Sequence, residues 1–131
     1  MSFTVPSIEP SELAGLPSPA MVIFHDRLIA NLDEMLVMAE HPKRLRPHCK
    51  THKMDHIIRL WVERGVTKHK AATIAECEML ASAGAKDVLF AYNPVGPNVG
   101  RIVALAKKFP ACGFTATTDH ERPLRELSES A

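Results

Sequence analysis

The stretch that decides the fold is VTKHKAATIAECEMLASAGAKDVLFAY, residues 66–92. Its first part, residues 66–73, has the pattern of a polar strand, and its last part, residues 87–92, that of an apolar strand. Residues 73–85, which join them, have the composition of a helix that ends near a glycine. A strand, a helix and a second strand in this order predict a βαβ unit, in which the two strands run parallel.

The same alternation continues on both sides of this unit. Further strands are expected at residues 20–24, 44–52 and 112–119, and further helices at residues 25–41, 54–65, 99–109 and 120–131. Strand and helix thus alternate five times, which predicts an α/β protein with a parallel sheet, either an open doubly wound sheet or a (β/α)8 barrel.

Two properties of the chain bear on this choice. Two of the strands carry charged residues along one face, which favours the barrel, because an interior strand of an open sheet is usually apolar on both faces. A full barrel needs about 250 residues, whereas the chain has 131. We therefore expect either an open sheet or the N-terminal part of a (β/α)8 TIM-type barrel. Residues 1–19, with four prolines, are expected to form an irregular leader before the alternating part, residues 20–131.

The composition excludes several classes of function. Hydrophobic residues make up 46% and charged residues 24% of the chain, which is typical of a globular protein. The formal net charge of +1 gives no overall field that would attract nucleic acid or a membrane surface. The odd number of cysteines, Cys49, Cys77 and Cys112, indicates reduced thiols. With neither a signal-peptide pattern nor a long apolar run, we expect a cytoplasmic protein.

A basic segment precedes the βαβ unit: RLRPHCKTHK, residues 44–53. In a strand, alternate side chains share a face, so one face would carry a column of four nitrogen-bearing side chains, those of Arg46, His48, Lys50 and His52. Inside a barrel this column would be costly without an anionic guest, which a phosphate-bearing cofactor would supply. A solvated edge strand is the alternative.

Lys50 lies in the middle of this column. Neighbouring positive charge disfavours the protonated form of a lysine, and a neutral amine is the nucleophile of Schiff-base chemistry. Lys50 is therefore a candidate reactive lysine facing an anion site. If the segment were helical instead, His48, His52 and His56 would align at four-residue steps as a transition-metal site, although the adjacent cations would repel the ion. Cys49 would point to the packed side as a buried, inert thiol.

Thr73 and Glu76 have the spacing of a capping box. Thr73 is most simply the N-cap of its helix, and a cofactor contact is the alternative. Lys70, on the strand before it, adds positive potential to the same cavity or faces solvent.

Two segments, RPHCKTHK and KAATIAECEMLASAGAKDVLFAYNPVGP, residues 46–53 and 70–97, resemble the N-terminal part of fold-type III pyridoxal-phosphate enzymes. The resemblance is strongest to D-threonine aldolase and the eukaryotic-type D-serine dehydratases, which have an alanine-racemase-like barrel, and it covers roughly residues 17–131. In that group the first lysine of an RPHxKTHK motif carries the cofactor as a Schiff base. By this resemblance, that lysine is Lys50.

The resemblance implies a lyase that uses pyridoxal 5′-phosphate and acts on a D-3-hydroxy amino acid by retro-aldol cleavage or β-elimination. It implies that residues 20–131 are a partial cofactor-binding barrel, with the cofactor held by Lys50, His48, Arg46, His52 and Thr73. In relatives a divalent metal is bound in a C-terminal β domain, which we expect to be absent here, so we expect no metal ligands.

Three alternatives remain open: a non-catalytic pyridoxal-phosphate-binding protein, an inactive fragment of such an enzyme, and an amino-acid racemase. Exposed sheet edges also predict a homo-oligomer or a missing C-terminal half as partner.

Overall fold

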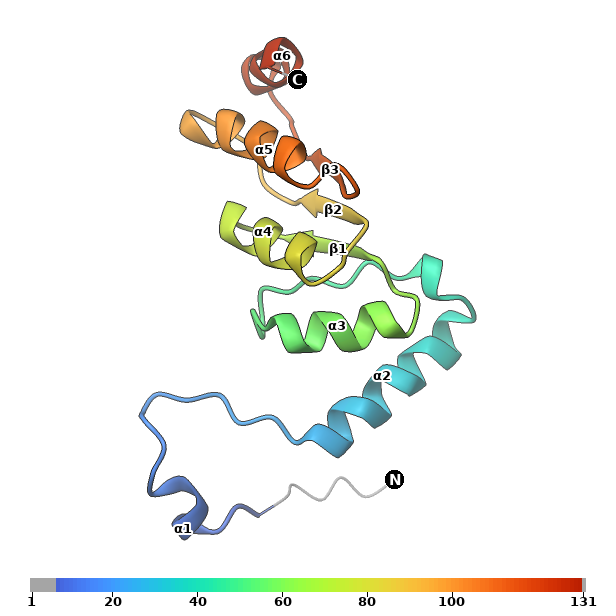
Figure 1. Ribbon diagram of the computed structural model, residues 1–131, viewed down its shortest axis with the longest axis vertical. Helices are drawn as coiled ribbons and strands as arrows, with labels where there is room; N and C mark the ends of the chain where they lie inside the picture. Colours follow the sequence, from blue (N-terminus) through green and yellow to red (C-terminus); the bar gives the residue numbers. More distant parts are fainter. Residues whose placement is uncertain (1–6, 131) are drawn as a thin grey trace.

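The computed structural model describes residues 7–130, in which helices and parallel strands alternate (Figure 1). The helices are α1 (Pro10–Leu13), α2 (His25–Ala39), the 3₁₀ helix η1 (Pro42–Arg44), α3 (Asp55–Glu63), α4 (Ile74–Ser82), α5 (Pro97–Lys108) and α6 (Glu121–Ser130). The strands are β1 (Lys68–Ala71), β2 (Asp87–Phe90) and β3 (Gly113–Ala116). Within the described part of the chain, no helix is both long enough and apolar enough to cross a membrane.

The strands form one parallel sheet in the order β1-β2-β3, as the sequence predicts. A short extended segment continues the sheet beyond β1. His48 forms a parallel bridge to Lys70, and the backbone N–H of Lys70 donates to the carbonyl of Pro47 at 2.8 Å. Four neighbouring segments therefore lie side by side in chain order, and their carboxyl ends meet at the same edge of the sheet.

Only one face of the sheet is covered by helices in the described structure. His69 and Ala71 of β1 and Val88 and Phe90 of β2 are buried, and these strands pack on α4 (Figure 1). The intervening residues, such as Lys70, point to the other face and are only half-buried. A doubly wound sheet has helices on both faces. The arrangement therefore matches a partial α/β barrel, although the barrel does not close within residues 7–130.

A second apolar cluster fixes α2 against α3. Leu32 of α2 and Trp61 of α3 are 3% and 5% exposed and belong to one buried group. Helix α3 ends before Gly65, whose φ of 83° is a left-handed conformation that glycine adopts easily.

Two of the predicted strands are wrong. Residues 20–24 are assigned to no strand and run apart from the sheet (Figure 1). Met21 is 54% exposed there, because a β-branched, apolar sequence forms a strand only where a neighbour supplies hydrogen bonds. Residues 44–52 pair with β1 only around His48. Arg44 ends η1, and the backbone N–H of Lys53 donates to the carbonyl of Cys49 at 2.8 Å, which closes a turn.

The predicted leader is described only from residue 7 onward; residues 1–6 lie outside the described residues. It contains one short helix, α1, and is otherwise irregular.

His69 gives the fold a dependence on pH. It is fully buried, and its Nε2 lies 3.0 Å from the carbonyl of Val66, so this nitrogen carries the proton, and Nδ1 has no hydrogen-bond partner among residues 7–130. Burial lowers the pKa of His69. The unfolded chain therefore takes up a proton at a higher pH than the folded one, and stability falls as the pH drops below about 6.5.

We expect the free energy of unfolding in urea to fall less between pH 7.5 and pH 5.5 in His69→Gln than in the unchanged protein. His56→Gln, at an exposed position, is the control and should keep the original slope. An unchanged slope in His69→Gln would contradict this assignment.

Candidate functional site

The polar residues that follow the parallel segments gather at the carboxyl edge of the sheet. Lys50 follows the bridge at His48, Thr73 follows β1, Asn93 follows β2, and Asp119 follows β3. Because these strands are parallel and in register, the four positions lie at the same edge of the sheet. This is the end at which α/β proteins place their functional groups.

Lys50 lies in the turn formed by residues 49–53 and is exposed. Its backbone N–H donates to Nδ1 of His48 at 3.2 Å. Neither Lys50 nor Lys70 takes part in any of the ion pairs formed among residues 7–130. The predicted column of four side chains is therefore replaced by a turn, which presents Lys50 at the sheet edge beside two other basic groups, His48 and Lys70.

His48 is half-buried between these cations. Burial lowers the pKa of its imidazole, and the positive charges of Lys50 and Lys70 lower it further, while Glu76 acts in the opposite direction. At neutral pH the ring is therefore uncharged, and the amide of Lys50 fixes its orientation through Nδ1.

Glu76 is the buried carboxylate of this region, with 5% of its surface exposed. Its Oε2 accepts a hydrogen bond from the backbone N–H of Ala72 at 2.7 Å, and its Oε1 lies 3.2 Å from Nζ of Lys53. Burial raises the pKa of Glu76, but the Ala72 amide and Lys53 together lower it more, so the net change is downward. The carboxylate of Glu76 therefore stays charged at pH values below those at which a glutamate ordinarily takes up a proton.

Thr73 is the N-cap of α4, as predicted, because its hydroxyl oxygen accepts from the backbone N–H of Glu76 at 3.1 Å. The second half of the predicted capping box differs from the prediction. Glu76 bonds the N–H of Ala72, one residue before the N-cap, rather than that of Thr73. The Thr73 hydroxyl proton is left to donate to a group at the sheet edge.

Cys49 is buried, as predicted, with 1% of its surface exposed. Its thiol lies 3.7 Å from Oε2 of Glu76. Burial, followed by the charge of Glu76, raises the pKa of Cys49 to about 12. Cys77 and Cys112 are also free and buried. A thiol that keeps its proton at neutral pH is a poor nucleophile.

His48, Cys49 and Glu76 place three potential metal-ligating atoms within 4.8 Å of one another. Two observations weigh against a cation there: Lys53 is already paired with Glu76, and His48 lies beside positive charges. The predicted alternative of a histidine triple is wrong in its geometry. Residues 48–52 are not helical, since α3 begins only at Asp55.

Arg46 and His52 have other partners in the structure. The Arg46 guanidinium donates to both carboxylate oxygens of Asp87, at 2.7 and 2.5 Å. Asp87 is the first residue of β2, so this ion pair lies at the end of the sheet opposite to Lys50. Nδ1 of His52 accepts from the backbone N–H of Met54 at 3.1 Å and thereby orders the start of α3. Of the five residues predicted to hold a cofactor, the structure thus gathers Lys50, His48 and Thr73 at the carboxyl edge.

Sequence reasoning missed the roles of Asp87 and Lys53. Asp87 opens an otherwise apolar strand, which was a usable signal for a partner of a nearby basic residue. No pattern in the sequence pointed to Lys53, because its side chain reaches Glu76 only through the turn.

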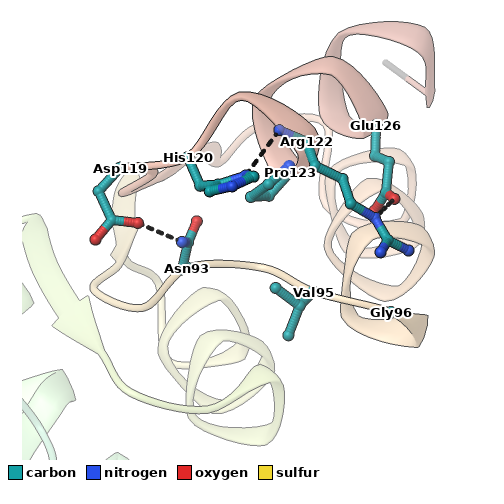
Figure 2. Close-up of a pocket in the computed structure, with 8 residues that line it drawn as sticks. All are labelled: Asn93, Val95, Gly96, Asp119, His120, Arg122, Pro123 and Glu126. Atoms are coloured by element: carbon teal, nitrogen blue, oxygen red, sulfur yellow. Dashed lines mark hydrogen bonds and ion pairs between the residues drawn. The ribbon is translucent and has the colours of Figure 1, made fainter.

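A pocket of about 380 Å³ lies at the same edge, between the loops that follow β2 and β3 and the start of α6 (Figure 2). Nδ2 of Asn93 donates to Asp119 at 2.5 Å across it, and Arg122 pairs with Glu126 at 2.7 Å. Oδ1 of Asn93 is buried and has no hydrogen-bond partner within the described part of the chain.

The observed architecture is thus an arc of parallel strands with helices on one face and a lysine at the carboxyl edge. Among solved structures, the chain is similar to D-threonine aldolase from Filomicrobium marinum. The TM-score is 0.77 at 29% sequence identity, and the match covers 90% of this chain and 32% of that one. The chain therefore spans about a third of that enzyme's length. No family model and no curated protein matches. The structural match supports a relationship to fold-type III pyridoxal-phosphate enzymes.

The Arg46–Asp87 pair yields a prediction for stability. Hydrogen bonds between charged groups contribute about 1.5–3 kcal/mol, and partial exposure reduces this. We therefore expect Asp87→Asn to lower the free energy of unfolding by about 1 kcal/mol at pH 7. The hydrogen bond from Arg46 is the main cause that lowers the pKa of Asp87. The contribution of the Arg46–Asp87 pair to the free energy of unfolding is therefore present above about pH 3.9 and is lost in stronger acid.

Urea titrations at pH 7 and pH 3 check this, and the difference between the two proteins should shrink at pH 3. Asp33→Asn removes a more exposed partner, that of Arg64, and should have a smaller effect at pH 7. An equal effect of the two variants would count against the pair.

The N-cap yields a second prediction. Thr73→Ala should lower the free energy of unfolding by about 1 kcal/mol, because the Glu76 amide loses its acceptor. Thr73→Ser keeps the hydroxyl and should restore most of the difference in the same urea titration. If the serine variant were as unstable as the alanine variant, the cap would not be the cause.

Proposed function

We propose that this chain is the lysine-bearing part of a pyridoxal-phosphate-dependent lyase that acts on a D-3-hydroxy amino acid, with Lys50 as the residue that binds the cofactor aldehyde. The observation that carries the proposal is the position of Lys50. It is exposed in a turn at the carboxyl edge of a parallel sheet, and its ammonium has no ion-pair partner among residues 7–130. The similarity to D-threonine aldolase supports the reaction class.

The residues at this edge fit an anionic cofactor. Lys50 and Lys70 supply positive charge without a carboxylate of their own, so a phosphate would meet cations that are not already neutralised. The buried carboxylate nearby, Glu76, is balanced by Lys53 and does not cancel that charge. Lys50 would bind the aldehyde, while His48, Lys70 and the Thr73 hydroxyl would contact the polar groups of the cofactor.

Pyridoxal phosphate, when bound, supplies the electron sink for cleavage beside the amino group of the substrate. Lys50 must give up a proton at Nζ before it can act as a nucleophile. The uncharged His48 next to it offers a nitrogen for moving that proton. Retro-aldol cleavage of D-threonine yields glycine and acetaldehyde, which provides a direct assay.

The assignment of Lys50 is tested by adding pyridoxal phosphate to the purified chain, followed by borohydride reduction and peptide mass spectrometry. We expect a phosphopyridoxyl group mainly on Lys50, at a level at least about tenfold above that on other lysines, because Lys50 is exposed in the turn at the sheet edge and lies next to a proton acceptor, His48.

The control is Lys107→Ala, at an exposed lysine of α5, which should leave the labelling of Lys50 unchanged. Lys50→Ala should abolish the specific adduct without increasing labelling elsewhere. Labelling spread evenly over surface lysines would overturn the assignment.

The lyase reaction is tested in a chimera, because the chain spans only 32% of the matched enzyme. We propose that a further polypeptide or a second copy of the chain completes the active site. Replacing the matching segment of D-threonine aldolase from Filomicrobium marinum with this chain should preserve acetaldehyde release from D-threonine. Lys50→Ala should abolish that release. A folded chimera without activity would refute the proposed reaction.

A further inference from the structure

The turn that carries Lys50 has an unusual backbone. It is closed by the hydrogen bond from the Lys53 N–H to the Cys49 carbonyl at 2.8 Å. Lys53 has a φ of 49°, a left-handed conformation that residues other than glycine rarely adopt. Such a conformation persists where surrounding contacts hold it in place.

Glu76 connects this turn to the rest of the fold. Oε1 lies 3.2 Å from Nζ of Lys53, and the thiol of Cys49 lies 3.7 Å from Oε2. One carboxylate therefore contacts both ends of the turn, one residue before Lys50 and three residues after it. The same Oε2 accepts from the Ala72 amide, at the junction of β1 and α4. Since Glu76 is almost fully buried, these contacts are shielded from solvent on its side.

We propose that the Glu76–Lys53 ion pair clamps the turn of residues 49–53 against the start of α4 and so fixes the position of Lys50. Glu76 and Lys53 are then positioning residues, since neither carries the reacting amine. The role of the clamp in placing Lys50 for the cofactor rests on the proposed function. The existence of the clamp does not depend on that function. It also explains why a left-handed lysine, rather than glycine, stands at position 53: glycine would relax the backbone but remove the cation.

The competing explanation is that Glu76 only stabilises α4. Thr73→Ala separates the two, because it removes the N-cap hydrogen bond and leaves the clamp intact. Glu78→Gln is the matched charge control. Glu78 lies on the same helix and pairs at 2.6 Å with Lys108, a residue of α5 and not of the turn.

The first readout needs no cofactor. Cys49 and Cys77 are both buried, but only Cys49 belongs to the turn. We expect Glu76→Gln and Lys53→Met to raise the rate of Cys49 alkylation by N-ethylmaleimide about tenfold, the change expected for loss of an ion pair with a buried carboxylate. Trypsin cleavage of the native protein after Lys50 should rise in parallel in Glu76→Gln. The alkylation of Cys77 should not change.

Rescue by charge distinguishes a clamp from general loosening. Lys53→Arg keeps the cation and should behave like the unchanged protein. The double variant Glu76→Gln/Lys53→Met should be no more reactive than either single variant, because both remove the same interaction. The proposal is overturned if Thr73→Ala or Glu78→Gln exposes Cys49 as strongly as Glu76→Gln, or if the two single effects add.

The second readout is the phosphopyridoxyl labelling of Lys50. Glu76→Gln should reduce it about tenfold, in line with the same lost interaction, and Lys53→Arg should preserve it. Unchanged labelling in Glu76→Gln, with Cys49 exposed, would overturn the positioning role. If the unchanged protein were not labelled at Lys50 at all, the proposed function would fail. The cysteine and trypsin readouts would then still decide whether the clamp exists.

Discussion

The hydrogen-bond ladder of the parallel sheet is the constraint on which the rest of the structure depends. Parallel pairing of β1 with β2 and of β2 with β3 brings all the carboxyl ends to one edge. The bridge at His48 adds the turn of Lys50 to that edge. Lys50 and Thr73, far apart in sequence, come to the same edge only because their segments pair with or follow β1. The face of the sheet that carries His69 and Val88 is buried and packs against the helices.

Two ion pairs neutralise basic groups at the two ends of this sheet. At the amino end, Arg46 is neutralised by Asp87 through two hydrogen bonds. At the carboxyl end, Lys53 is neutralised by Glu76, while Lys50 and Lys70 remain without carboxylates in the described part of the chain. An end that keeps uncompensated cations beside an uncharged histidine is suited to an anionic ligand. The carboxyl edge is also where α/β proteins place their functional groups.

The helices were the most predictable part of the fold, because their amphipathic periods and end signals are local. Thr73 and Gly65 marked helix boundaries correctly for this reason. The strands were harder to predict. The apolar run at residues 20–24 has strand-like composition but no partner. The basic segment alternates like a strand, yet it pairs only at His48 before it turns. Pairing is a long-range property that composition does not encode.

By itself, the sequence determined the alternation of strands and helices, the parallel sheet, the burial of Cys49 and the choice of Lys50 as the candidate reactive residue. These follow from periodicity, turn chemistry and residue type, which are properties of neighbouring positions. Only the tertiary structure decided that Arg46 pairs with Asp87, that His52 orders α3, and that Glu76 holds the Lys50 turn through Lys53. Each of these contacts depends on where the backbone turns and which segments it brings together. A charged side chain pairs with the opposite charge that lies nearest in space, which need not be near in sequence.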